Sequence, residues 1–176
     1  SLRRSVASSP SPPPLQLHSI PSEDPAVYDM ICQADTIGVF QVESAAQMQT
    51  TPRLRPKNLF DLAHEVGAVR PGVGVNDGIT QYILRRQGKL RETYEHPLER
   101  KALERTRGVI LFQDQVNQLA MDVAGFSAVE ADQLRRAFIR KHNESLIAFY
   151  WEKFRQGAQE LGVPQEAIER IFKKFN

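Results

Sequence analysis

Residues 113–141 read QDQVNQLAMDVAGFSAVEADQLRRAFIRK, and this stretch decides the fold class. Its first half repeats apolar residues every three or four positions, as is typical of an amphipathic helix: Val116, Leu119, Ala120 and Val123. Ser127 and Glu130 then form an S-x-x-E capping box, which predicts the start of a second helix. We therefore expect two consecutive helices, over 113–124 and 128–141.

The same helical patterns continue outward over the chain from residue 22. Asp24 before Pro25 is typical of a helix start, because the aspartate caps the free amides and proline fits the first turn. Similar signals predict further helices over 25–33, 44–50, 56–69, 76–87, 97–108, 143–161 and 164–175. Residues 35–41 are predicted as an extended connector and 109–112 as the one plausible, very short strand.

These patterns predict an all-α fold, an irregular multi-helix domain with at most one very short strand, over residues 15–176. In the 56–69 helix, the residues expected to face the core are Leu59, Leu62, Ala63 and Val66. Cys32 is expected to be a small buried core thiol. Residues 1–14, SLRRSVASSPSPPP, are rich in serine and proline and are predicted to be a disordered tail, with an organellar transit peptide as the alternative.

Composition excludes several classes of protein. The chain has 176 residues, 41% of them hydrophobic and 25% charged, as in an ordinary soluble domain. It contains no apolar run of about 18 residues, which a membrane-spanning helix needs. Its single cysteine excludes an internal disulfide and a cysteine-cluster zinc site. A formal net charge of +2 excludes a uniformly basic nucleic-acid coat but allows a local basic face.

The sequence offers no catalytic residue and no metal ligand set. None of the four histidines lies three or four residues from another: His18, His64, His96 and His142. No D-x-D pair is present. Glu130 and Asp132 are two positions apart, but they fall on a helix, where residues at this spacing point about 200° away from each other. The carboxylate pair that metal-assisted phosphoryl transfer requires is therefore not visible.

Two groups of basic residues are candidate binding sites. On the 128–141 helix, Asp132, Arg136 and Arg140 share one face, and Arg135 and Lys141 flank it. Guanidinium groups match phosphate oxygens, so this face is a candidate phosphate site, and a solvated face neutralised by Asp132 is the alternative. A second group is predicted to contact DNA, although cations at a helix end are also favoured by the helix dipole alone: Arg85, Arg86 and Lys89.

Several long segments resemble the bacterial C-family DNA polymerases, the DNA polymerase III alpha subunits. They are, in order, SEDPAVYDMICQAD at 22–35, TIGVFQVESAAQM at 36–48, LRPKNLFDLAHEVGAVRPG at 54–72 and GVILFQDQVNQLAMDVAGFSAVEADQLRRAF at 108–138. The resemblance covers about residues 15–176. It implies the helical fingers domain, which closes over the incoming nucleotide and follows the palm in the family.

The resemblance also assigns roles to individual residues. Arg135 and Arg136 match the paired arginines expected to meet the triphosphate of the incoming nucleotide. Arg140 and Lys141 match basic positions on the same helix. Two glutamines match the Q-x-Q element beside the nucleotide pocket: Gln113 and Gln115. The segment RPGVGVNDGITQYILRRQG departs from the replicative branch, so the resemblance favours the error-prone branch.

The implied parent reaction is template-directed nucleotidyl transfer in replication or repair, in the cytoplasm and away from the membrane. Its partners would be deoxynucleoside triphosphates, primer–template DNA and the subunits of a replication or repair holoenzyme. Magnesium is implied for the parent, held by palm aspartates that this chain lacks, so the chain alone is expected to bind no cofactor and to be inactive. The alternatives are a truncated remnant or helical interaction module with exposed apolar faces, and a helical transcription factor.

Overall fold

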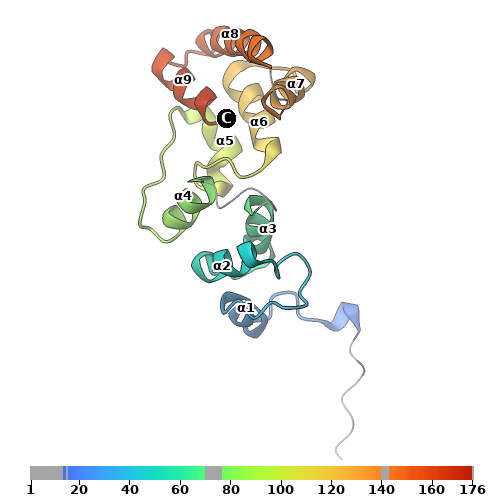
Figure 1. The fold of residues 1–176 in the computed structure, drawn as a ribbon. Coiled ribbons are helices and arrows are strands. Elements are labelled where there is room, and N and C mark those ends of the chain that lie inside the picture. The colour runs from blue at the N-terminus through green and yellow to red at the C-terminus, as the bar shows by residue number, and fades with distance from the viewer. Residues whose placement is uncertain (1–13, 15, 70–76, 140–142, 176) are drawn as a thin grey trace, which may run out of the picture.

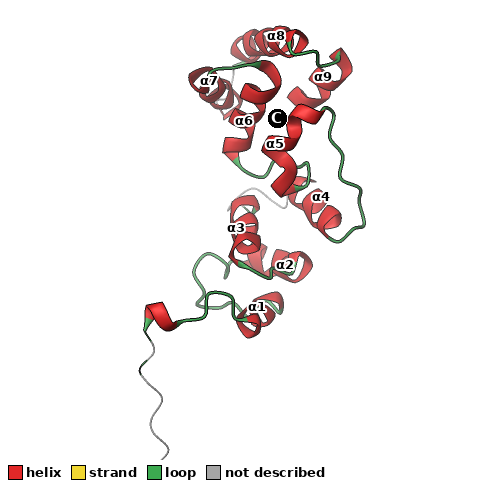
Figure 2. Ribbon diagram, turned by 180° about the vertical axis from the view of Figure 1, so that it is seen from behind, coloured by secondary structure: helices red, strands yellow, loops and turns green. Residues whose placement is uncertain are grey.

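The computed structural model describes residues 14, 16–69, 77–139 and 143–175. These residues form nine α-helices and contain no strand, which confirms the predicted all-α class (Figure 2). The predicted tail over 1–14 lies almost wholly outside the described residues. The helices are α1 (Pro25–Cys32), α2 (Ala45–Leu54), α3 (Leu59–Ala68), α4 (Asp77–Arg86), α5 (Arg100–Leu103), α6 (Gln113–Ala124), α7 (Ala128–Ile139), α8 (Glu144–Glu160) and α9 (Gln165–Lys173).

The helices are arranged along one long axis, as Figure 1 shows. Helices α1, α2 and α3 form one half of the molecule, α5 to α9 form the other half, and α4 lies between them. Three short 3₁₀ segments complete the order: η1 (Leu17–Ser19), η2 (Pro97–Glu99) and η3 (Glu104–Thr106). The end of α9 returns to the middle of its half, beside α5 (Figures 1 and 2).

The larger hydrophobic core lies among α6, α7, α8 and α9. Each of these helices contributes a side chain with no exposed surface: Leu119, Leu134, Phe154 and Ile168. Phe154 also packs against the rings of Phe172 and Phe175, with centroids 5.4 and 5.5 Å away. A smaller core joins α2 and α4 to the segment before α6: Leu54, Ile79, Tyr82, Ile83, Val109 and Leu111.

Several predicted helix ends are confirmed, but the single helix predicted over 97–108 is wrong: that segment is the four-residue α5 between the 3₁₀ segments η2 and η3. The Asp24 carboxylate accepts a hydrogen bond of 2.9 Å from the Ala26 amide at the start of α1. At the start of α7, the Glu130 carboxylate accepts from the Ser127 amide at 2.9 Å, and the Ser127 hydroxyl accepts from the Glu130 amide at 3.3 Å. Asn143 precedes α8, but its side chain makes no capping hydrogen bond, so that predicted cap is wrong.

Three local expectations are corrected by the structure. Residues 35–41 form successive turns rather than an extended connector, because Gly38 and Gln41 take the left-handed conformation with φ of 84° and 65°. Residues 109–112 are not a strand. Helix α2 continues through Pro52 to Leu54, four residues beyond its predicted end. Pro52 has no amide hydrogen, so this last turn of α2 lacks one backbone hydrogen bond.

Cys32 differs from its predicted environment as well. It is only half-buried, and its thiol donates to the Pro56 carbonyl oxygen at 3.4 Å.

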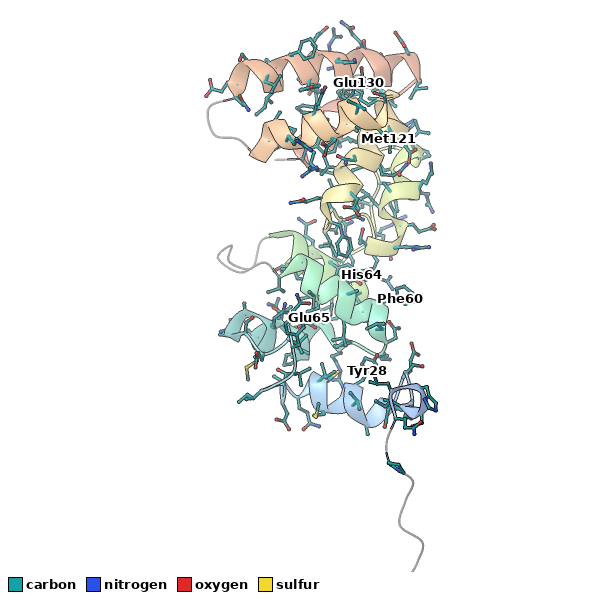
Figure 3. All side chains as sticks on the ribbon, turned by 90° about the vertical axis from the view of Figure 1, so that its right-hand side faces the viewer. Tyr28, Phe60, His64, Glu65, Met121 and Glu130 are labelled. Atoms are coloured by element: carbon teal, nitrogen blue, oxygen red, sulfur yellow. The ribbon has the colours of Figure 1, made fainter. Side chains whose placement is uncertain are left out.

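Helix α3 buries a different face from the one that its apolar spacing predicts. Its two buried side chains are the acids Asp61 and Glu65, whereas Leu59 and Phe60 are 67% and 73% exposed and Ala63 is also exposed. The acids face inward because each has a polar partner there: Thr51 of α2 for Glu65 and Arg86 of α4 for Asp61. Figure 3 labels Glu65 and Phe60 on this helix.

Candidate nucleotide-binding site

Helix α7 is fixed to the core by one face and presents arginines on another. Ala131, Leu134 and Ala137 are buried with at most 1% exposure, which fixes the rotation of the helix. Glu130, labelled in Figure 3, pairs with Lys153 on α8 and ties the first turn of α7 to the neighbouring helix. The rotation leaves Asp132, Arg135 and Arg136 at the edge of the core, where solutes can reach them.

The centre of the candidate site is one carboxylate shared by two guanidinium groups. Arg135 donates through Nε and Nη2 to Asp132 Oδ1, at 3.1 and 2.7 Å. Arg136 Nε lies 2.7 Å from Asp132 Oδ2. The remaining Arg135 nitrogen, Nη1, donates to Gln113 Oε1 at 3.2 Å. The Arg135 side chain is 21% exposed and that of Arg136 is 61% exposed, so Arg136 is the more accessible of the two.

The electrostatics of this group favour an anion. The hydrogen bond from Arg135, with the charge of Arg136, lowers the pKa of Asp132 below its usual value, so the carboxylate is ionised at neutral pH. One negative charge shared by two positive charges leaves an excess positive charge at the surface. Gln113 is the first residue of the twelve-residue helix α6, whose N-terminal dipole end adds positive potential beside Arg135, and Asp114 in the same turn offsets part of it.

The two predicted glutamines have different surroundings. Gln113 is exposed and contacts Arg135 directly. Gln115 is buried: Oε1 accepts from the Leu111 and Phe112 amides at 2.8 and 2.9 Å, and Nε2 donates to Ala102 O and Thr106 Oγ1 at 3.0 and 2.7 Å. Gln115 therefore fixes the chain that enters α6 and, through it, the position of Gln113.

A cavity of about 330 Å³ adjoins the arginine pair on the side of α8. Arg136 and Gln133 line it from α7, and Leu146 and Tyr150 line it from α8. The Tyr150 hydroxyl donates to Gln133 Oε1 at 2.9 Å, which fixes the amide at the cavity wall. Of the four basic residues predicted on this helix, Arg140 and Lys141 lie outside the described residues.

The second basic group is largely engaged within the fold. Arg86 pairs with Asp61 through both guanidinium ends at 2.6 Å, and its Nε donates to the Leu54 carbonyl oxygen at 3.1 Å. Arg85 is buried, and only Lys89 is exposed. The structure therefore gives two of these three residues intramolecular partners, and their contact with DNA stays a prediction.

A family comparison identifies the chain. The profile described as "Bacterial DNA polymerase III alpha subunit finger domain" matches residues 5–162, which is most of the 176 residues. The chain belongs to this finger domain family. The resemblance seen in the sequence motifs is thereby confirmed.

The finger domain is similar to proteins named error-prone DNA polymerase. It is 47% identical to the one from Nocardia farcinica over 162 residues, 92% of this chain and 14% of the relative. The relative from Mycobacterium bovis is 49% identical over 153 residues, 86% and 14% of the two chains. The one from Bordetella parapertussis is 56% identical over 124 residues, 70% and 12%. The finger domain thus spans about one seventh of the length of the first two relatives.

Three further observations concern metal sites, membrane helices and exposed apolar side chains of the finger domain. Among the described residues, no three His, Cys, Asp or Glu side chains gather in a way that could hold a metal ion. None of the described helices combines the length and the apolar character that a bilayer crossing requires. The α1–α3 half carries exposed apolar side chains, of which Ile37 and Phe40 are 83% and 84% exposed in the turns before α2.

Sequence reasoning missed the polar contacts that join α3 to its neighbours. Asp61 pairs with Arg86 of α4, and Glu65 accepts a short hydrogen bond from the Thr51 hydroxyl of α2. His64 Nδ1 lies 2.8 Å from the Tyr82 hydroxyl of α4. No signal in the sequence marks these contacts, because apolar periodicity finds buried hydrophobic residues and is blind to acids that face inward beside a partner.

Proposed function

We propose that this finger domain grips the triphosphate of an incoming deoxynucleotide through Arg135 and Arg136 of α7. The observation that carries the proposal is the shared carboxylate of Asp132, which holds both guanidinium groups side by side. Guanidinium groups form paired, charge-assisted hydrogen bonds to phosphate oxygens. A triphosphate would compete with Asp132 for the arginines and would form additional hydrogen bonds with nitrogens that face solvent.

The proposed contribution to the reaction is electrostatic and positional. In nucleotidyl transfer, negative charge on the phosphate oxygens must be stabilised while the nucleotide is held in line with the attacking group. Arg136, the more exposed of the pair, would meet the phosphates first, and Arg135 would be oriented by Gln113. In the parent polymerase, magnesium held by other residues would supply the metal chemistry.

We further propose that the parent polymerase is of the error-prone branch, acts in the cytoplasm, and uses primer–template DNA. The support is the identity of 44–56% to relatives that carry the name error-prone DNA polymerase. Of the three residues predicted to contact DNA, Lys89 has the exposure that a backbone phosphate contact needs. Its contribution would be a salt-dependent attraction rather than sequence recognition.

The first prediction concerns triphosphate affinity. In the double variant Arg135→Ala/Arg136→Ala, we expect the dissociation constant for a deoxynucleoside triphosphate to rise by at least about tenfold, because two charge-assisted contacts are lost. Isothermal titration calorimetry of the 176-residue chain measures this constant. Added salt should weaken wild-type binding, since the attraction is between charges.

A matched control removes a guanidinium group elsewhere. Arg155 of α8 pairs with Glu152 in the same way that Arg135 pairs with Asp132. The variant Arg155→Ala should bind the triphosphate as the wild type does. Equal affinities of the double variant and the wild type would exclude the α7 arginines from the nucleotide site.

A further inference from the structure

A second cationic cavity lies on another part of the molecule, between α4 and α9. Its volume is about 450 Å³, within the range of small-molecule sites. The segments before η2 and before α6 complete its walls. Among the side chains that the structure describes, those with a charge that line it are one carboxylate, Glu95, and four cations: Arg85, Arg170, Lys173 and Lys174.

Arg85 is a buried cation without a carboxylate partner among the described residues. Only 9% of the surface of Arg85 is exposed. Nη1 donates to the Arg107 carbonyl oxygen at 2.6 Å and Nη2 to the Thr93 hydroxyl at 3.1 Å, and both acceptors are neutral. Among the described residues, Nε has no hydrogen-bond partner and no acid pairs with Arg85. A buried charge in this state is costly unless an anion compensates it.

The guanidinium group is held in one position by the backbone around it. Gly108 has a φ of 79°, and a Cβ at this position would lie 2.7 Å from Arg85 Nη1 and 2.7 Å from the Thr93 carbonyl oxygen. The absence of a side chain at Gly108 lets the arginine reach the cavity wall. Together with its two hydrogen bonds, this packing preorganises Arg85 for a ligand.

The other cations of the cavity differ in how far they are neutralised. Lys174 pairs with the fully buried Glu99 at 2.6 Å, so its charge is compensated. Arg170 lies 3.6 Å from Glu95 and 2.9 Å from Glu166, which is exposed. Lys173 is exposed and has no ion pair with any described side chain. Arg85 and Lys173 therefore have no ion pair with a described carboxylate, and Glu95, the one described carboxylate of the cavity, lies nearest to Arg170 among the printed ion pairs.

We propose that this cavity binds a phosphate group. A phosphate carries enough negative charge to compensate Arg85 and Lys173 together, and its oxygens can accept from a guanidinium group and an ammonium group at once. The phosphate could belong to a free polyphosphate or to a nucleic-acid backbone. The residues of this cavity come from α4, α9 and the segments 93–95 and 108–110, so the site is separate from the α7 arginines.

The test uses inorganic pyrophosphate as the probe and the backbone amides of Thr93 and Gly108 as reporters in ¹H–¹⁵N NMR spectra of the 176-residue chain. We expect both amides to shift in a saturable way below about 10 mM pyrophosphate. Lys173→Gln should raise the dissociation constant about fivefold, because one of the two uncompensated charges is lost. Lys101→Gln, which removes an exposed lysine of α5, should leave it unchanged.

Further arms distinguish this cavity from the α7 arginines and identify the source of the phosphate. The double variant Arg135→Ala/Arg136→Ala should keep the shifts at Thr93 and Gly108, whatever happens to its triphosphate affinity. A single-stranded oligonucleotide of about 12 nucleotides that displaces pyrophosphate would identify a nucleic-acid backbone as the source, and failure to displace it would identify a free polyphosphate. The proposal is overturned if the two amides do not shift, if succinate shifts them equally, or if Lys101→Gln weakens binding as much as Lys173→Gln.

Discussion

At pH 8, the variant Glu65→Gln is expected to be more stable than the wild type by about 3 kcal/mol. Glu65 has no exposed surface, and burial raises the pKa of its carboxyl group from 4.5 to about 7. Its Oε1 accepts from the Thr51 hydroxyl, whereas Oε2 has no partner among the described residues. Above pH 7, the wild type therefore buries a carboxylate with one oxygen unsatisfied, and glutamine removes that charge while keeping an acceptor for Thr51.

The pH dependence follows from the direction of this shift. The raised pKa means that the folded chain holds a proton on Glu65 over the interval in which the unfolded chain has lost it. The protonated carboxyl group thus contributes its full stability below about pH 4.5, and this contribution is lost as the pH rises to about 7. The stability of the wild type relative to Glu65→Gln should fall across that interval and then stay constant.

Urea denaturation followed by far-UV circular dichroism at pH 5 and pH 8 measures this difference. The comparison between the two proteins is essential, because burial lowers the pKa of the nearby His64, which gives an opposite trend with pH in both. Equal stability differences at the two pH values would show that Glu65 titrates normally and that its environment is not as described.

The variant Gly157→Ala is expected to lose about 3 kcal/mol of stability. Gly157 lies in α8 where this helix crosses α6, and a Cβ there would overlap the carbonyl oxygen of Ala124. An alanine in a helix interior normally gains about 1 kcal/mol over glycine, so the expected loss runs against the intrinsic preference. The backbone of α6 cannot move aside as a flexible side chain would, so α8 must shift, and with it the support for α7.

The matched control is Gly67→Ala in α3. A Cβ at Gly67 would overlap the ring of Phe112, which is a side chain and is half-buried, so it can rotate away at a smaller cost of about 1 kcal/mol. Both variants are compared with the wild type by urea denaturation at constant m-value. A Gly157→Ala variant as stable as the wild type would show that α6 and α8 do not cross this closely.

Much of the fold could be predicted from the sequence because its signals are local. The Ser127–Glu130 capping box and the apolar stripe of 113–124 depend on residues within one or two turns, and both are confirmed. The signature motifs also sufficed to recognise the family, because each is long and all occur in order. Arg135 and its contact Gln113 were both among the predicted nucleotide-site residues, although no helical pattern says that they touch.

The remaining features depend on contacts between distant segments. The apolar spacing of α3 predicts that Leu59 faces the core. Asp61 and Glu65 face inward instead, because Asp61 pairs with Arg86 and Glu65 accepts a hydrogen bond from Thr51. The fork between Asp61 and Arg86 joins residues 25 positions apart, and the burial of Arg85 depends on the carbonyl of Arg107. Arg85 and Arg86, which the sequence places at the end of a helix where they could face solvent, are therefore held within the fold.

The most direct test of the phosphate grip on α7 is an NMR titration that follows the arginine Nε–H groups with a deoxynucleoside triphosphate. We expect the Nε–H signals of Arg135 and Arg136 to shift together and saturably, because the phosphates take both groups from Asp132. In Asp132→Asn the same shifts should occur at lower concentration, since the competing negative charge is gone. Unchanged signals of both arginines at a triphosphate concentration that shifts other residues would contradict a grip by this pair.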